Sequence, residues 1–114
     1  MKTVNLALIG AGGIGKVWSG AIRKTDGINL AMVADVDKAR AEELARGFSG
    51  CVSSGRWEDA VAASGVSAVI VAVPTPMHYE VGKNALTAGA HVLIEKPLAS
   101  SVEEAKELLD LSES

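Results

Sequence analysis

The sequence predicts an α/β fold, a doubly wound parallel sheet with helices on both faces. Apolar runs alternate with amphipathic runs along all 114 residues, and nothing resembles a linker or a repeat. Hydrophobic residues make up 48% of the chain but aromatic residues only 4%, so the core must be aliphatic. Aliphatic strands of this kind are typical of parallel sheets between helices, for which we expect the strand order 3-2-1-4-5.

Five apolar runs account for the expected strands. They cover residues 3–9, 28–34, 50–53, 67–73 and 91–95. The first run leads directly into a group of glycines, and the second ends in Asp35. Each run is short and bounded by polar or turn-forming residues, which favours buried strands over helices.

Five amphipathic segments between and after these strands predict helices. They cover residues 13–24, 37–46, 56–63, 76–88 and 101–111. Pro76 suits the first turn of the fourth helix, and Gly89 lies just past its end. Val102 and Leu109 belong to an apolar face of the last helix, which we expect to dock on the sheet.

The turn after the first strand reads Gly10-Ala-Gly12-Gly13-Ile14-Gly15. A strand that enters a G-x-G-x-x-G turn and then a helix is typical of a Rossmann-like dinucleotide site. Gly10 permits the tight turn, Gly12 lets the backbone approach a pyrophosphate, and Gly15 lets the helix pack closely on the strand. The phosphates would bind the free N–H groups at the start of the helix. Alone, the spacing also fits an ordinary strand-to-helix turn.

Asp35 follows the second strand at the position expected for a ribose-binding carboxylate. It lies 20 residues beyond Gly15 (35 − 15). Its charge would repel a 2′-phosphate, so the sequence favours NAD over NADP. The alternative is a turn or helix N-cap, although Asp37 could fill that role two residues later.

Composition excludes several classes of function. The net charge is −3 and basic residues do not cluster, which argues against nucleic acid as a partner. No apolar run approaches membrane-spanning length and the first strand leaves no room for a signal peptide, so we expect a cytoplasmic protein. Cys51 is the only cysteine and has no neighbouring histidine in the sequence, so we interpret it as a packing residue and expect no metal site.

Two further motifs follow the fourth and fifth strands. They read Val73-Pro-Thr-Pro-Met-His78 and Ala88-Gly-Ala-His-Val-Leu-Ile-Glu-Lys-Pro97. With the glycine turn, they make the chain resemble, over essentially its whole length, the N-terminal part of the glucose–fructose oxidoreductase, inositol dehydrogenase and rhizopine-catabolism (Gfo/Idh/MocA) family. The glycine turn is shared by many dinucleotide enzymes, whereas the pair of later motifs is far more selective.

The resemblance implies roles for five residues. Pro74 and Thr75 would line the cofactor near the nicotinamide ribose, His78 would help to bind it from the next helical turn, and Glu95 would contact that ribose. Lys96 would face the reacting carbon of the substrate and polarise its oxygen, as a cation does when alkoxide character develops. The alternative for Lys96 is an edge lysine leaving the sheet.

Other residues remain open between site and scaffold. The resemblance implies that Arg40 covers the adenine, and a solvated helix residue is the alternative. We interpret Trp18 and Trp57 as packing residues and His91 as a surface or structural residue far from the site. Pro97 could form a cis bond with Lys96.

The chain is short for an enzyme of this kind, so we expect residues 1–114 to be one incomplete domain. It would be truncated before the sixth strand and before the C-terminal substrate domain that supplies an Asp and a His in the family. We therefore expect the cofactor-binding part of an NAD-dependent oxidoreductase of a sugar, inositol or related polyol. The longer protein would be a homo-oligomer, and the fragment alone would be inactive.

Two alternatives come from other classes. One is a sensor that keeps the nucleotide fold without chemistry, which an intact Glu95-Lys96-Pro97 disfavours. The other is a semialdehyde or dipicolinate reductase, which would leave that motif unexplained.

Overall fold

The computed structural model describes residues 3–113 as a five-stranded parallel sheet in the order β3-β2-β1-β4-β5. This confirms the predicted doubly wound α/β topology. The strands are β1 (Val4–Ile9), β2 (Ile28–Ala34), β3 (Val52–Ser54), β4 (Ala68–Val71) and β5 (His91–Ile94). The helices are α1 (Gly13–Arg23), α2 (Lys38–Ala45), α3 (Trp57–Ala62), α4 (His78–Thr87) and α5 (Val102–Glu113), with a 3₁₀ turn, η1 (Thr75–Met77), before α4.

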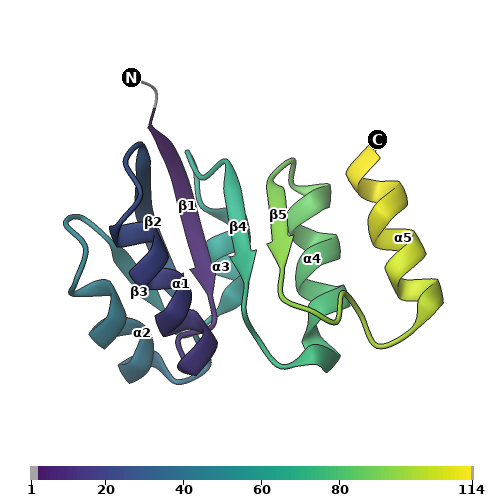
Figure 1. Ribbon diagram of the computed structural model, residues 1–114, viewed down its shortest axis with the longest axis horizontal. Helices are drawn as coiled ribbons and strands as arrows, with labels where there is room; N and C mark the ends of the chain where they lie inside the picture. The colour runs from purple at the N-terminus through teal and green to yellow at the C-terminus, as the bar shows by residue number, and fades with distance from the viewer. Residues whose placement is uncertain (1–2, 114) are drawn as a thin grey trace.

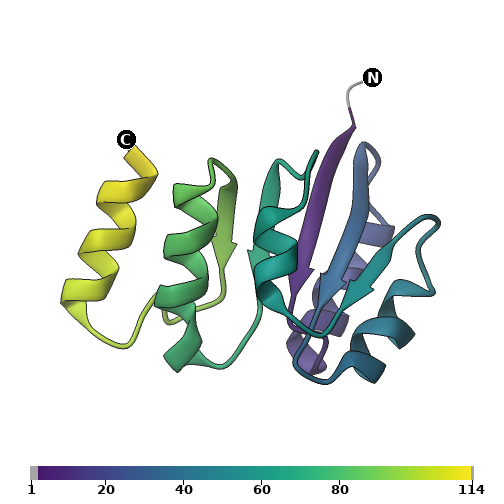
Figure 2. The same ribbon diagram turned by 180° about the vertical axis from the view of Figure 1, so that it is seen from behind.

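The helices form two layers that cover the sheet unequally. Helices α1 and α2 lie over β1, β2 and β3 on one face (Figure 1), and α3, α4 and α5 lie on the other (Figure 2). Each layer seals its own apolar cluster, one around Leu8 and Leu30 and the other around Ile9 and Val71, all at most 1% exposed. The face of β4 and β5 on the side of α1 carries no helix (Figure 1). The sheet is thus covered on both faces at β1 and β2, whereas β4 and β5 are covered by helices on one face.

The region after β4 differs from the prediction. The strand ends at Val71 rather than residue 73, and the helix expected from residue 76 is preceded by the η1 turn. Pro74 and Pro76 explain both differences, because proline cannot donate to a ladder and disfavours helical geometry in the residue before it. Gly89 has a φ of +92° just after α4 and ends that helix as predicted.

Helix α5 does not dock on the sheet as expected. Its buried residue is Leu108, at 2% exposure, whereas Val102 and Leu109 are 67% and 55% exposed. Figure 2 shows α5 beside α4 and beyond β5, where no strand lies beneath it. Its buried contact is therefore with α4, where Leu108 lies close to Gly82.

Candidate functional site

The carboxyl ends of β2, β1 and β4 meet at the point where the chain order of the sheet reverses. There the backbone N–H of Gly10 donates to the Ala34 carbonyl at 2.7 Å, and that of Ala72 donates to the Ile9 carbonyl at 2.8 Å. Ligands of open α/β sheets bind in the crevice outside such a switch point. The turns that follow these strands therefore form the candidate site.

Two glycines of the first turn are required by backbone contacts. Gly10 has a φ of +110°, and a Cβ there would overlap the carbonyl group of Ala72. A Cβ on Gly15 would overlap the carbonyl group of Gly10. Neither obstacle is a flexible side chain, so only glycine fits, and the predicted tight turn and close helix packing are both present.

The glycines between them face open space instead. A Cβ on Gly12 or Gly13 would meet no atom within 4 Å, and no side chain caps the start of α1 at Gly12. The first N–H groups of a helix have no partner within it and carry the positive end of its dipole. This end of α1 therefore offers both the room and the donors that a phosphate needs.

A pocket of about 390 Å³ lies over this helix end. Its walls contain predicted site residues from three turns, namely Gly10, Gly12, Gly13, Ile14, Asp35, Arg40 and Pro74. They also contain residues that we had not assigned to the site, including Val36, Trp57 and Met77. Trp57 packs against the apolar core, as expected, and lines the pocket as well. Nothing in its local sequence distinguishes these two roles.

Asp35 lies at the pocket wall and braces the glycine turn. Its Oδ2 accepts the backbone N–H of Ala11 at 2.7 Å, and its Oδ1 accepts that of Asp37 at 2.8 Å. A carboxylate oxygen has two lone pairs, so each can accept one more hydrogen bond, such as one from a ribose hydroxyl. The helix cap is instead Asp37, which accepts from the N–H groups of Ala39 and Arg40.

Arg40 lies on the first turn of α2 with its side chain exposed at the pocket rim. Its Nε lies 3.5 Å from Asp37 Oδ2, and an exposed pair of this kind holds a side chain only weakly. The guanidinium can therefore move over a ligand in the pocket.

His78 occupies a different place from the one we expected. Its ring is 1% exposed and does not line the pocket. Nδ1 lies 2.8 Å from the Pro97 carbonyl oxygen, and Nε2 lies 2.8 Å from the Val73 carbonyl oxygen. Direct cofactor contact is therefore blocked by the ring's own partners. His78 thus links the turn after β4 to the turn after β5 from outside the pocket.

The remaining predicted residues follow β4 and β5 at the same edge of the sheet. Thr75 begins the η1 turn and Lys96 is exposed after β5, with a cis bond to Pro97. Within residues 3–113, the Lys96 ammonium makes no ion pair. Glu95 is half-buried, and its Oε1 accepts a 2.6 Å hydrogen bond from Trp18 Nε1.

Other kinds of site were sought among the same residues. No group of three or more His, Cys, Asp and Glu side chains in the described part of the chain is placed to hold a metal ion. None of the helices described is both long enough and apolar enough to span a membrane. Burial raises the pKa of the Cys51 thiol to about 11, so this side chain is a protonated packing residue at neutral pH.

Comparisons with known proteins agree with this geometry. Residues 4–114 match the model of the Gfo/Idh/MocA oxidoreductase family, described as having an NAD-binding Rossmann fold. An inositol 2-dehydrogenase of Corynebacterium glutamicum (strain R) is 34% identical over 113 residues, which are 98% of this chain and 34% of that protein.

Solved structures give the same picture. GenD2 from gentamicin A biosynthesis, in complex with NAD, is 28% identical with a TM-score of 0.94, over 99% of this chain and 32% of that one. A myo-inositol 2-dehydrogenase from Lactobacillus plantarum is 25% identical with a TM-score of 0.89, over 98% of this chain and 33% of that one. The chain thus spans about a third of the length of these relatives.

Proposed function

The chain belongs to the oxidoreductase family with an NAD-binding Rossmann fold, and on this premise we propose that it is the nucleotide-binding part of an NAD-dependent dehydrogenase of inositol or a related polyol or sugar. The observation that carries the proposal is the open helix end at Gly12 and Gly13, with the Asp35 carboxylate on the wall of the same pocket. Inositol dehydrogenases among the relatives support the substrate class.

The cofactor lies across the switch point in this proposal. The pyrophosphate binds the N–H groups of α1 beside Gly12 and Gly13, where no side chain obstructs it. Asp35 accepts the adenine ribose hydroxyls and disfavours the 2′-phosphate of NADP by charge repulsion. Arg40 lies over the adenine, while Pro74, Thr75 and Glu95 hold the nicotinamide ribose.

Lys96 is the catalytic residue of the proposal. When bound, NAD supplies the acceptor for the hydride that leaves the C–H bond beside the substrate hydroxyl. The exposed ammonium of Lys96 hydrogen-bonds the hydroxyl oxygen and stabilises its developing negative charge. The residue that binds the rest of the substrate and completes proton transfer belongs to a separate substrate domain, outside the third of the relatives' length that this chain spans.

The proposal is tested first by calorimetric titration of the chain with NADH and with NADPH. We expect NADH to bind more tightly. Asp35→Asn keeps an oxygen that can accept the N–H of Ala11 but removes the charge. It should therefore lower the ratio of the Kd for NADPH to the Kd for NADH by roughly tenfold. Asp37→Asn is the matched control, because asparagine caps helices as well as aspartate and Asp37 does not line the pocket. Equal affinity for both nucleotides in the unmodified chain would refute the choice of NAD.

The role of Lys96 is tested in the longer protein. Lys96→Ala should lower kcat by about 10²-fold to 10⁴-fold with inositol as substrate, because it removes a group that acts on the reacting oxygen. Affinity for NADH should change little. Lys106→Ala, on the exposed side of α5, is the control and should leave kcat as it is. An unchanged kcat in Lys96→Ala would remove this residue from the catalytic role.

The second candidate is a nucleotide-binding sensor of the same fold. It would share the pocket but lack turnover. The kcat of the unmodified longer protein, measured beside Lys96→Ala, therefore separates the two candidates. For the longer protein, we propose that it is a homo-oligomer located in the cytoplasm. Size-exclusion chromatography with light scattering would test the assembly.

A further inference from the structure

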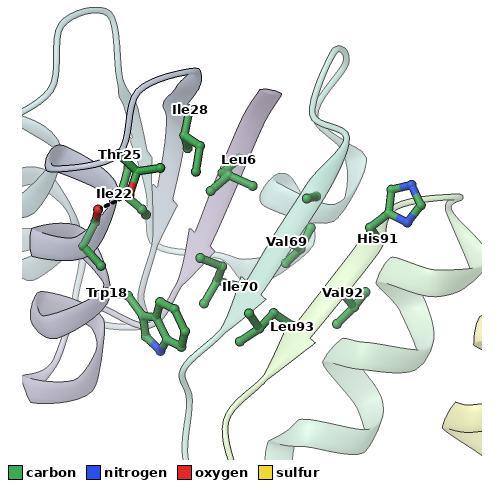
Figure 3. A pocket seen from close by; sticks show the side chains of 12 residues that line it. Leu6, Trp18, Ile22, Thr25, Ile28, Val69, Ile70, His91, Val92 and Leu93 are labelled. Atoms are coloured by element: carbon green, nitrogen blue, oxygen red, sulfur yellow. Dashed lines mark hydrogen bonds between the residues drawn. The ribbon is translucent and has the colours of Figure 1, made fainter. Parts of the chain in front are cut away.

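A partly buried hydrogen bond connects helix α1 to the end of β5. Trp18 is on the second turn of α1, and its Nε1–H donates to Glu95 Oε1 at 2.6 Å, although the residues are 77 positions apart. Figure 3 shows the indole between α1 and β4, with its nitrogen directed toward the carboxyl ends of the strands. The hydrogen bond therefore lies near the carboxyl ends of the strands, and it joins α1 to the turn after β5, which no backbone ladder connects.

The indole packs on one side against α1 and the sheet. Together with Ile22, Ile70 and Leu93, it forms part of the wall of an open apolar hollow of about 300 Å³. It also packs against the buried cluster under α1. This packing and the 2.6 Å hydrogen bond to Glu95 together set the direction of the indole N–H. An indole donates but cannot accept, so Trp18 also dictates that the group it meets is an acceptor.

The bond divides the two oxygens of the Glu95 carboxylate. Oε1 is taken by Trp18, whereas Oε2 makes no hydrogen bond to any of residues 3–113. Hydrogen bonds to a carboxylate are about twice as strong as those between neutral groups, so this bond fixes the orientation of the whole group. Oε2 is left as the oxygen for a ligand.

We infer that Trp18 is a positioning residue for the nicotinamide ribose, acting through Glu95. It holds Oε1 and presents Oε2 to the ribose hydroxyls, so that the helix receiving the pyrophosphate also orients the group receiving the second ribose. This inference rests on the proposed function. It adds a residue of α1 that faces away from the pocket and touches no part of the cofactor.

The hydrogen bond itself is tested without cofactor. We expect the indole N–H resonance of Trp18 to lie downfield in the ¹H–¹⁵N NMR spectrum and to exchange slowly with solvent. Glu95→Gln, which replaces the charged acceptor with a neutral one, should shift that resonance upfield and leave the Trp57 resonance in place. A Trp18 resonance that ignores Glu95→Gln would overturn the inference.

The function of the bond is tested by comparing ligands that differ in one ribose. Trp18→benzothienylalanine replaces the N–H with sulfur and preserves the shape of the ring, and Trp18→Phe gives a second, smaller replacement. Binding of NADH and ADP-ribose, which carry the second ribose, should weaken roughly tenfold. Binding of ADP, which lacks it, should stay within about twofold.

The outcomes separate the two proposals. If the unmodified chain binds none of the three ligands, the proposed function fails and the inference fails with it. If the unmodified chain binds NADH more tightly than ADP and both Trp18 variants keep that difference, the proposed function stands and only the inference is overturned. Equal weakening of all three ligands would also overturn it, because that result indicates a general effect on α1.

Discussion

The two halves of the candidate site are built by different means. At the ends of β1 and β2, the backbone itself makes the site: Gly10 and Gly15 bring main chains into contact, and the Asp35 carboxylate braces the turn. At the ends of β4 and β5, long-range side-chain hydrogen bonds from Trp18 and His78 hold the turns in place. The first half tolerates no added atom at Gly10 or Gly15, whereas the second depends on particular donors.

This contrast predicts different responses to substitution. Where backbone meets backbone, an added methyl group has nowhere to go and the fold suffers. Where a side chain hydrogen-bonds two turns, its removal lowers the free energy of unfolding by the value of that hydrogen bond. The turns then become more mobile, while the sheet remains intact. The largest loss of stability should therefore come from the backbone contacts of Gly10 and Gly15, and substitutions in the second half should act more on ligand affinity.

The largest effect is expected at Gly15. Gly15→Ala places a Cβ on the Gly10 carbonyl and should lower the free energy of unfolding by about 3 kcal/mol. Chemical denaturation followed by circular dichroism measures it. Gly12→Ala is the control: its Cβ meets open space, so stability should fall by less than about 1 kcal/mol while NADH affinity drops. Similar losses of stability in both variants would break the comparison.

A smaller effect is expected at His78. His78→Phe keeps a buried ring but removes the two ring nitrogens that face the Val73 and Pro97 carbonyls, so the free energy of unfolding should fall by about 1–2 kcal/mol. NADH affinity should fall further than ADP affinity, because both turns lie where we propose that the nicotinamide ribose binds. His91→Phe, at an exposed strand start, should change stability by less than about 0.5 kcal/mol. An ADP loss as large as the NADH loss would contradict the assignment of the His78 hydrogen bonds to one half.

The smallest effect on stability is expected at Arg40. Arg40→Ala breaks an exposed ion pair with Asp37 and should change the free energy of unfolding by less than about 0.5 kcal/mol. If Arg40 covers the adenine, NADH and ADP should both bind severalfold more weakly, as calorimetry would show. Arg56→Ala removes a similar exposed pair with Glu58 outside the pocket and should leave both affinities unchanged.

The same contrast explains what could be predicted from the sequence. The glycine turn and the strand order follow from local patterns, because a positive φ favours glycine and a buried strand requires consecutive apolar residues. The bond between Trp18 and Glu95 has no such local pattern, since its partners are 77 residues apart and an apolar helix position suits any large side chain. His78 was placed at the cofactor because a motif gives a residue's neighbourhood but not the direction of its ring.

The predicted docking of the last helix on the sheet was wrong for a related reason. Its apolar pattern predicted that Val102 and Leu109 face the sheet, but both are exposed and Leu108 is the buried residue. Docking on the sheet would require a strand beneath α5, and none of the described strands lies there. For this helix, the packing against α4 decided both which side is buried and what covers it.

The pairing of β1 with β4 also bears on how the protein comes to be folded. Leu6 pairs with Ala68, 62 residues later (68 − 6), so this contact closes a long loop. Such contacts form late, because the entropy lost in closing the loop precedes any gain from packing. On the ribosome, β1, α1 and β2 emerge well before the strand that completes the switch point. The pocket wall formed by Ala72, Val73 and Pro74 is therefore added to the glycine turn only after β4 has been made.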